Sequence, residues 1–316
     1  MVVRIKRKFR SLFRNSVFLS QVYSKLNTIK TKSLSFTNDE LYTKMRYYEN
    51  TGLNLNLKNP TTFNEKLSWL KINYRTPLMT KCSDKIEVHD YLHEIGLSHL
   101  SNPIRGVYDT AEEVPFSEMS GKFFIKCNHV SGTNAFFDSN KSSNFNRKRF
   151  NKEFNKALKE NYYYQSREWN YKNITPKILV EDFIESQSKL ADYRFFCFHG
   201  KVKLVFVDIE TASEDGKHNP NAKRNIYDEQ FNLQDFTVGR DNFDESLVKK
   251  PNNFQLMVEY AEKIANPFIF CRVDLYNNDG EIKFGEITFY PGGATQQFSS
   301  EEADLLASSW LDIKST

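Results

Sequence analysis

Alternation of apolar and polar residues predicts two neighbouring strands towards the C-terminal end of the chain. The alternation runs over residues 268–276 and again over 281–290, with Asn277-Asn278-Asp279-Gly280 between the two segments. Because Asp-Gly between strand-like segments is a strong signal for a tight turn, the segments are expected to pair as a β-hairpin.

The rest of the chain mixes helical and strand-like segments. Short apolar runs predict strands over 123–127, 135–137, 177–184 and 201–209, and from Asp192 onward. Helical spacing and capping residues predict helices over 2–26, within 37–74 on both sides of Asn59-Pro60, over 84–96, 146–164 and 255–265, and after the capping box Ser299-Ser300-Glu301-Glu302. The predicted fold class is α+β, in a chain of 316 residues that can bury a substantial core.

The N-terminal segment is strongly basic. Residues 1–35 contain nine Lys or Arg and no Asp or Glu, and the predicted helix over 2–26 is amphipathic with a basic polar face. Such a helix either lies on anionic lipid, through a peripheral contact of residues 1–30 with the inner membrane, or packs on its own domain with the basic face in water. The pattern favours neither alternative.

Composition narrows the functional classes. The chain has 44 Lys and Arg, of which nine lie in residues 1–35, so the rest of the chain has 35 basic and 40 acidic residues. This mildly acidic balance excludes a nucleic-acid-binding surface after residue 35.

The four cysteines are far apart and the histidines lack zinc spacing, so free thiols in a reducing cytoplasm are expected, without structural zinc. No apolar run approaches the ~18 residues of a membrane span, and a cytoplasmic location is expected.

The predicted hairpin carries candidate chemistry. Strand alternation puts Arg272 and Asp274 on one face of the first strand, and Glu286 and Thr288 on one face of the second. Two carboxylates that meet beside an arginine suit Mg²⁺, which proteins usually hold with one or two carboxylates together with nucleotide phosphates. From this stretch alone, an ordinary hairpin with its acids in water is an equal alternative.

Two further segments are candidates for nucleotide contacts. Lys126 ends a predicted strand and is followed by a loop of small residues over 129–134, an arrangement that can cover phosphates although it lacks the Walker spacing. An ordinary hairpin is the alternative. The predicted strand over 177–184 has Glu181, Asp182 and Glu185 at its end, and a strand edge that offers backbone groups beside acidic side chains can read an adenine rim and a ribose.

Taken in order, several short motifs resemble the ATP-grasp superfamily. They are Asp84-Lys85, Phe124-Ile125-Lys126, Ile178-Leu179-Val180-Glu181, Arg272-Val273-Asp274, and Glu286-Ile287-Thr288 followed by Pro291-Gly292. A narrower similarity, to the branch named for the teichuronopeptide biosynthesis protein TupA, is carried by residues 59–67, 126–129, 192–196 and 284–292. The resemblance covers about residues 59 to 294.

The resemblance implies a fold in which two α+β subdomains clasp ATP behind a helical N-terminal region. The corresponding divisions are residues 1–75 (basic and helical), 76–115 (pre-grasp segment), 116–185 (lid subdomain) and 186–316 (C-terminal subdomain with the metal site).

The resemblance also implies residue roles. For the phosphates, it implies that Lys85 and Lys126 contact the α- and β-phosphates and that Ser131 and Gly132 lie in the loop over the γ-phosphate. For the nucleoside, it implies that the main chain of Glu181, Asp182 and Phe183 reads the adenine and that Glu185 or Lys189 lies near the ribose. For catalysis, it implies that Asp274 and Glu286 hold Mg²⁺ and that Arg272 steadies the transferred phosphoryl group. Thr288 stands where the superfamily commonly has Asn, and its hydroxyl or a water fills that position. His129 and His199 are weaker acid–base candidates, because isolated histidines are more often structural.

The implied activity is a ligation of a carboxylate to an amine, with ATP and Mg²⁺. The carboxylate is expected to be a uronic acid of a bacterial surface polysaccharide, and the amine an amino acid. Two alternatives stay open. A glycosyltransferase of the same pathway needs a nucleotide-sugar site, and no Asp-x-Asp pair stands in a strand-to-loop setting. A non-catalytic membrane or partner adaptor needs only the fold.

Overall fold

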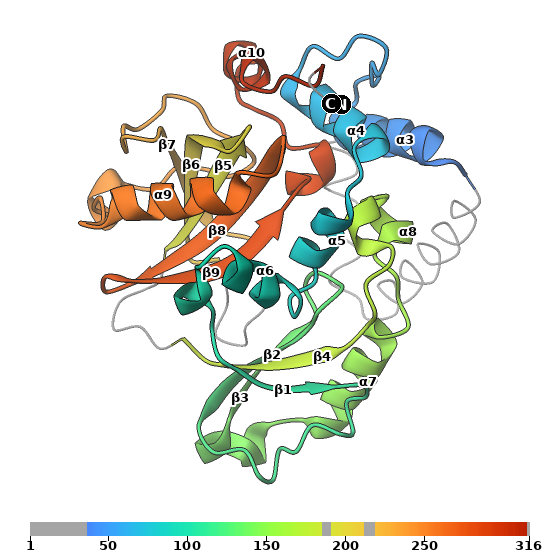
Figure 1. Cartoon of the computed structure of the whole chain (residues 1–316), viewed down its shortest axis with the longest axis vertical. Coiled ribbons are helices and arrows are strands. Elements are labelled where there is room, and N and C mark those ends of the chain that lie inside the picture. The colour runs from blue at the N-terminus through green and yellow to red at the C-terminus, as the bar shows by residue number, and fades with distance from the viewer. Residues whose placement is uncertain (1–36, 185–190, 212–218, 315–316) are drawn as a thin grey trace.

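A computed structural model describes residues 37–184, 191–211 and 219–314 of the chain. The predicted helix over 2–26 and its proposed membrane contact lie outside these residues. Two antiparallel sheets dominate the fold, which confirms the α+β class (Figure 1). The four-stranded sheet has the order β1 (Ile104–Tyr108), β4 (Ile178–Asp182), β2 (Lys122–Cys127), β3 (Asn134–Asp138). The five-stranded sheet has the order β7 (Lys223–Tyr227), β6 (Lys201–Ile209), β5 (Asp192–Phe198), β8 (Phe270–Asn278), β9 (Glu281–Thr288).

Helices connect and cover the sheets. The α-helices are α3 (Asp39–Thr51), α4 (Phe63–Asn73), α5 (Pro77–Ser83), α6 (Val88–Glu94), α7 (Arg147–Ala157), α8 (Tyr163–Ser166), α9 (Phe254–Ala265) and α10 (Glu301–Ser309). Short 3₁₀ turns are η1 (Ser98–Leu100), η2 (Ser139–Asn144), η3 (Trp169–Tyr171), η4 (Glu245–Leu247) and η5 (Pro291–Ala294). Figure 1 shows the two sheets at opposite ends of the molecule, with α5 and α6 between them. No helix in the described ranges is long and apolar enough to cross a membrane.

Two hydrophobic cores accompany the two sheets. The larger core packs α9 and the helices α4 to α6 against the five-stranded sheet, and it includes Phe63, Leu92 and Val273. The smaller core packs α7 against the four-stranded sheet through Phe150 and Phe154. Because β1 pairs with β4, the smaller sheet recruits a strand from the segment before residue 116. All four cysteines are buried and free, as the sequence predicts.

Local capping explains where several helices begin and end. Thr62 and Glu65 form a capping box at the start of α4, as the sequence predicts. The predicted continuous helix over 146–164 is wrong, because α7 ends at Ala157 and the side chain of Asn161 accepts a hydrogen bond from the N–H of Tyr163 (3.0 Å) at the start of α8. An Asn side chain that bonds its own nearby backbone favours such a break.

A bulge in the predicted hairpin sets which residues face each other. Asp279 and Gly280 form the turn with φ of 52° and 98°, as a primed hairpin turn requires. The pairing runs regularly from Asn278 opposite Glu281 to Leu275 opposite Phe284, then shifts by one residue at Gly285, so that Asp274 pairs with Glu286. In a regular ladder Asp274 would instead face Gly285, and Glu286 would turn towards the core.

Glycine is required at the bulge by close packing. A Cβ atom at Gly285 would lie 3.1 Å from the backbone oxygen of Asp274 and 3.1 Å from the ring of Tyr276. Because the neighbouring strand and an aromatic ring occupy this space, a larger residue would push the two strands apart at the point where the carboxylates meet.

Candidate active site

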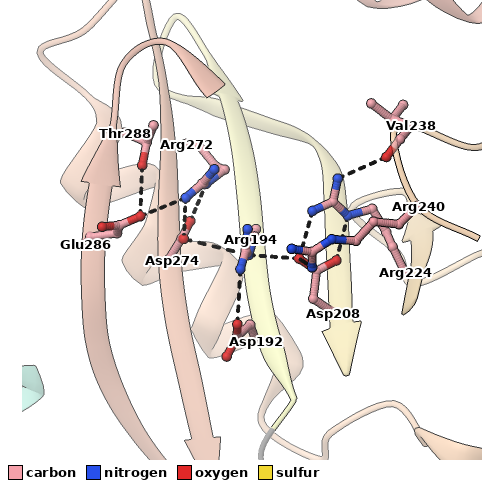
Figure 2. Close-up of polar contacts among 10 residues, drawn as sticks. All are labelled: Asp192, Arg194, Asp208, Arg224, Val238, Arg240, Arg272, Asp274, Glu286 and Thr288. Carbon is pink, nitrogen blue, oxygen red and sulfur yellow. Dashed lines mark hydrogen bonds and ion pairs between the residues drawn. The ribbon is translucent and has the colours of Figure 1, made fainter. Parts of the chain in front are cut away.

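The hairpin brings its four polar side chains together on one face of the five-stranded sheet (Figure 2). The guanidinium of Arg272 donates two hydrogen bonds of 2.6 Å to the carboxylate of Asp274 and one of 2.9 Å to Glu286 Oε1. The hydroxyl of Thr288 donates to the same Glu286 oxygen at 3.2 Å. The carboxylates predicted to converge therefore share one arginine between them.

Burial and charge act differently on the two carboxylates. Burial raises the pKa of Asp274 to about 6, against the lowering effect of Arg272 and Arg194. Burial also acts to raise the pKa of Glu286, but the positive charges of Arg272 and Lys85 outweigh it and hold that pKa below its usual value. The side chain of Glu286 is 47% exposed and that of Asp274 is 11% exposed, so Glu286 is the carboxylate that a ligand reaches first.

The donor set fits a divalent ion that arrives with phosphate ligands. Within residues 37–184, 191–211 and 219–314 no cluster of three or more His, Cys, Asp or Glu side chains can hold a metal. Asp274, Glu286 and Thr288 offer hard oxygens, and Mg²⁺ usually takes one or two carboxylates and leaves the other positions to phosphate and water. These residues would hold Mg²⁺ together with a nucleotide, after Arg272 gives up part of its contact with both carboxylates.

A cavity beside the hairpin contains the predicted phosphate contacts. Its polar lining includes Lys85, Lys126, Glu181 and Glu286. Lys126 Nζ lies 2.7 Å from Glu181, and Lys85 Nζ donates to the backbone oxygen of Val130 at 2.8 Å. The structure therefore places both lysines in the same cavity as the more exposed carboxylate of the hairpin.

Asn128 holds Lys85 and the loop after β2 in place. Its side chain, 1% exposed, donates to both carboxylate oxygens of Asp84 at 3.0 Å and accepts a hydrogen bond from the N–H of Lys177 at 2.7 Å. Burial lowers the pKa of Lys85, although Glu286 opposes this. Partly buried and anchored in this way, the lysine is a cation whose desolvation cost an anionic ligand would offset.

Four other predicted nucleotide contacts are either outside the cavity or outside the described residues. Ser131 and Gly132 are exposed in the turn between β2 and β3, and neither lines the cavity. Glu185 and Lys189 lie outside the residues that the structure describes. The roles assigned to these four residues stay predictions.

Glu181 does not lie on a sheet edge, because β4 is an inner strand between β1 and β2. The N–H of Asp182 donates to the carbonyl of Pro103, and the N–H of Phe183 donates to the carbonyl of Lys122. The carboxylate of Asp182 forms a bidentate pair with Arg105. These two N–H groups are therefore already used within the sheet, and adenine reading by the main chain at 181–183 stays a prediction.

Both histidine candidates have structural contacts. His129 is 2% exposed, and its ring nitrogens lie within hydrogen-bond distance of Asn128 Oδ1 and the carbonyl of Ala157. His199 Nε2 accepts a hydrogen bond from the N–H of Asp312 near the C-terminus. Neither lines the cavity.

The structure also shows charged residues that the sequence interpretation missed. Asp208, fully buried, accepts bonds of 2.5 and 2.7 Å from Arg224 and one of 2.7 Å from Arg240 (Figure 2). Arg194 lies 3.1 Å from Asp208 and 3.8 Å from Asp274, so it joins this cluster to the hairpin. Charged residues at alternate positions of otherwise apolar strands are the signal that points to such a layer. His89 and Tyr171 also line the cavity.

The chain matches one protein family. The sequence model of the family described as TupA-like ATPgrasp matches residues 65–310. Among curated proteins none matches.

Several solved structures are similar to the chain at low identity. An L-amino acid ligase from Bacillus licheniformis is 14% identical, with a TM-score of 0.41 over 70% of this chain and 46% of that one. A D-alanine–D-alanine ligase from Bacillus anthracis is 16% identical, with a TM-score of 0.37 over 66% and 57%. A D-alanyl-alanine synthetase A from Vibrio cholerae is 13% identical, with a TM-score of 0.40 over 78% and 65%. The chain thus spans roughly half to two thirds of the length of these proteins.

Proposed function

The chain belongs to the TupA-like family of ATP-grasp proteins, and from this premise we propose that it is an ATP-dependent carboxylate–amine ligase. The observation that carries the proposal is the cavity in which Lys85 and Lys126 lie with Glu286, while Asp274 and Arg272 stand behind that carboxylate. Cations for phosphates and oxygens for a divalent ion therefore meet in one place.

The proposed reaction has two steps. A substrate carboxylate attacks the γ-phosphorus of ATP and forms an acyl phosphate with release of ADP, and an amine then displaces phosphate to form an amide. Mg²⁺, held by Asp274 and Glu286, would supply neutralisation of phosphate charge. Lys85 and Lys126 would bind phosphate oxygens, and Arg272 would stabilise the transferred group. Positioning and charge account for most of the catalysis in phosphoryl transfer.

The proposed substrates are a uronic acid of a bacterial surface polysaccharide, such as a capsule, and an amino acid. This part of the proposal rests on the name of the family branch. The cytoplasm is the proposed location, with the basic residues 1–30 as a candidate contact with the inner membrane face.

The test is ADP formation from ATP, with uronic acids screened against the common amino acids. We expect continued turnover to ADP only when both a carboxylate and an amine are present, and none when EDTA removes Mg²⁺. Multiple turnovers to ADP that need only one of the two, or neither, would contradict a ligase. Nucleotide binding without turnover under every pairing would favour the adaptor.

Two variants test the proposed site. Glu286→Gln and Lys126→Ala are each expected to abolish ADP formation, because the first removes a metal ligand and the second a phosphate contact. Matched controls on the same strands are Glu281→Gln of β9 and Lys122→Ala of β2, both exposed, which are expected to keep the wild-type rate. A variant at position 286 or 126 with an unchanged rate would remove that residue from the site.

A further inference from the structure

A second cavity is lined by a residue next to η3, the turn that also contributes to the first cavity. Tyr171, the last residue of η3, lines the first cavity, while Glu168, which precedes η3, lines the second. Residues of α3, α4, α8 and η5 also line it. Its volume of about 180 Å³ is many times the ~10–15 Å³ that one water molecule needs. The cavity therefore has room for a small organic molecule.

Two opposite charges are buried in this cavity without an ion pair. Lys71 is 3% exposed and Glu168 is 5% exposed, and among the described residues neither makes an ion pair. Lys71 Nζ donates to the backbone oxygen of Gly293 at 3.3 Å. Buried charges are normally paired, so this separation is unusual.

The two charges nevertheless influence each other. Burial lowers the pKa of Lys71 to about 8, and Glu168 is the leading opposing charge. Burial raises the pKa of Glu168 to about 7, and Lys71 is again the leading opposing charge. Each side chain is thus the other's main counter-charge, and both line the same cavity without forming an ion pair.

Two hydroxyl groups on the cavity wall also lack partners. The side chains of Thr43 and Ser68 line the cavity and are 2% and 0% exposed. Their hydroxyl oxygens have no hydrogen-bond partner within the described part of the chain. Because buried polar atoms are nearly always hydrogen-bonded, two unpartnered hydroxyls beside one cavity are unusual, and a polar ligand together with a small shift of the wall would give them partners.

The segment η5 links the wall of this cavity along the chain to the strand of the proposed active site. Gly292 and Gly293 line the cavity and closely follow the strand that carries Glu286. Both have positive φ, of 59° and 66°, and a Cβ at Gly293 would meet nothing within 4 Å. The backbone is therefore bare where a ligand could approach it. The charge of Glu286 contributes to the raised pKa of Glu168, which shows that the two carboxylates lie within electrostatic reach.

A zwitterion matches these features better than an anion or a cation alone. We propose that the cavity binds a free α-amino acid, with its ammonium group against Glu168 and its carboxylate against Lys71. This rests on the proposed ligase function, of which the amino acid would be the amine substrate. Both buried charges then gain the partner that each lacks, and the backbone oxygen and hydroxyls of the wall accept or donate the remaining hydrogen bonds.

The first test uses the wild-type full-length protein without ATP. The common L-amino acids, glycine and D-alanine are screened by thermal shift, and the best binder is measured by calorimetry. We expect its amide, which lacks the carboxylate, and its N-acetyl derivative, which lacks the ammonium group, to bind at least tenfold more weakly. Absence of binding at 10 mM for every amino acid, or equal binding of the derivatives, would overturn the proposal.

Two variants assign the charges separately. Lys71→Met is expected to weaken binding of the amino acid at least tenfold but to leave the affinity for the amide unchanged. Glu168→Gln is expected to weaken the amino acid to the same degree but not the N-acetyl derivative. If each variant weakens all three ligands alike, Lys71 and Glu168 act only on the structure of the cavity, and the proposal fails.

The control is Lys66→Met on the same helix. Lys66 Nζ donates to the backbone oxygens of Ser308 and Leu311, outside the cavity, so its loss is expected to leave amino-acid affinity unchanged. Because binding is measured without ATP, the two proposals fail separately. Amino-acid binding without ADP formation would refute the ligase, whereas ADP formation that is indifferent to Lys71 and Glu168 would refute the cavity.

Discussion

Buried charges are arranged in opposite ways in two regions of the molecule. In the five-stranded sheet, Asp208 is in contact with three arginines, among them Arg224, which is 3% exposed and bidentate. In the cavity beside η3, Lys71 and Glu168 are buried to a similar extent but remain apart. A cluster in which every charge is paired holds its strands together, whereas buried charges without an ion-pair partner remain available to bind a ligand.

The hairpin site combines both arrangements. Asp274 is saturated by Arg272, while Glu286 receives one contact from the same arginine and is half exposed. Glu286 is directly available to a metal, whereas Asp274 becomes available only when Arg272 gives up part of its contact. The predictions below test this division between charges that stabilise and charges that bind, from the largest expected effect to the smallest.

Asp208→Ala should cause the largest loss of stability. It leaves Arg224 buried without its bidentate partner, and breaking a buried pair in this way costs about 3–5 kcal/mol. The free energy of unfolding from chemical denaturation measures it. Asp182→Ala is the matched control, because Asp182 also forms a bidentate pair, with Arg105, but the two side chains are 30% and 59% exposed respectively. Loss of this exposed pair should lower the free energy of unfolding by at most about 1 kcal/mol. Similar losses in both variants would contradict the assigned role of burial.

Gly285→Ala should disturb the bulge. The added methyl group meets the backbone oxygen of Asp274 and the ring of Tyr276, and overpacking of this kind costs about 1–3 kcal/mol. We also expect the rate of ADP formation to fall at least tenfold, because Glu286 is displaced from Asp274. The control is Gly52→Ala, where φ is +77° and the added methyl group would meet nothing within 4 Å. The positive φ should lower the free energy of unfolding, but the rate of ADP formation should stay at the wild-type value. A wild-type rate in Gly285→Ala would show that the bulge does not set the site.

The double variant Lys71→Met, Glu168→Gln tests the opposite arrangement. Removing two buried charges that stabilise nothing should leave the free energy of unfolding unchanged or raise it by about 1–4 kcal/mol. Chemical denaturation without amino acid measures this. A loss of more than about 1 kcal/mol would mean that the two residues stabilise the fold, as Asp208 does.

The pH dependence of amino-acid affinity should be the smallest effect. Glu168 is ionised above about pH 7 and Lys71 is protonated below about pH 8, so affinity should be highest between these values and fall up to tenfold per pH unit outside them. The other ionisable side chains on the cavity wall are Arg46, Tyr47 and Tyr162, and Glu286 acts on Glu168 from beyond it. Calorimetry from pH 6 to 9 measures the profile. Glu168→Gln should lose the acidic limb only.

Several local features follow from the sequence alone. Alternation around Asp279-Gly280 predicts the hairpin, and Thr62 with Glu65 predicts the start of α4, because turns and caps depend on residues only a few positions apart. The α+β class and the family follow from the order of short motifs such as Arg272-Val273-Asp274. The free cysteines follow from their spacing.

Other features depend on contacts between distant segments. The register shift at Gly285 places Glu286 opposite Asp274, and alternation by itself does not fix the position of a bulge. The inner position of β4 depends on β1, which local residues near Glu181 do not reveal.

The sequence by itself determined most of the helices and strands, the family and the acidic hairpin, because these depend on local patterns of side-chain polarity, although it missed β1 and β7. Only the tertiary structure decided which buried charges are paired. Lys71 and Glu168 come from distant parts of the chain and line the same cavity, and Asp208 is in contact with arginines from other strands and loops. Electrostatic energy depends on distance in space and on exclusion of water, and neither is encoded in the spacing of residues along a sequence.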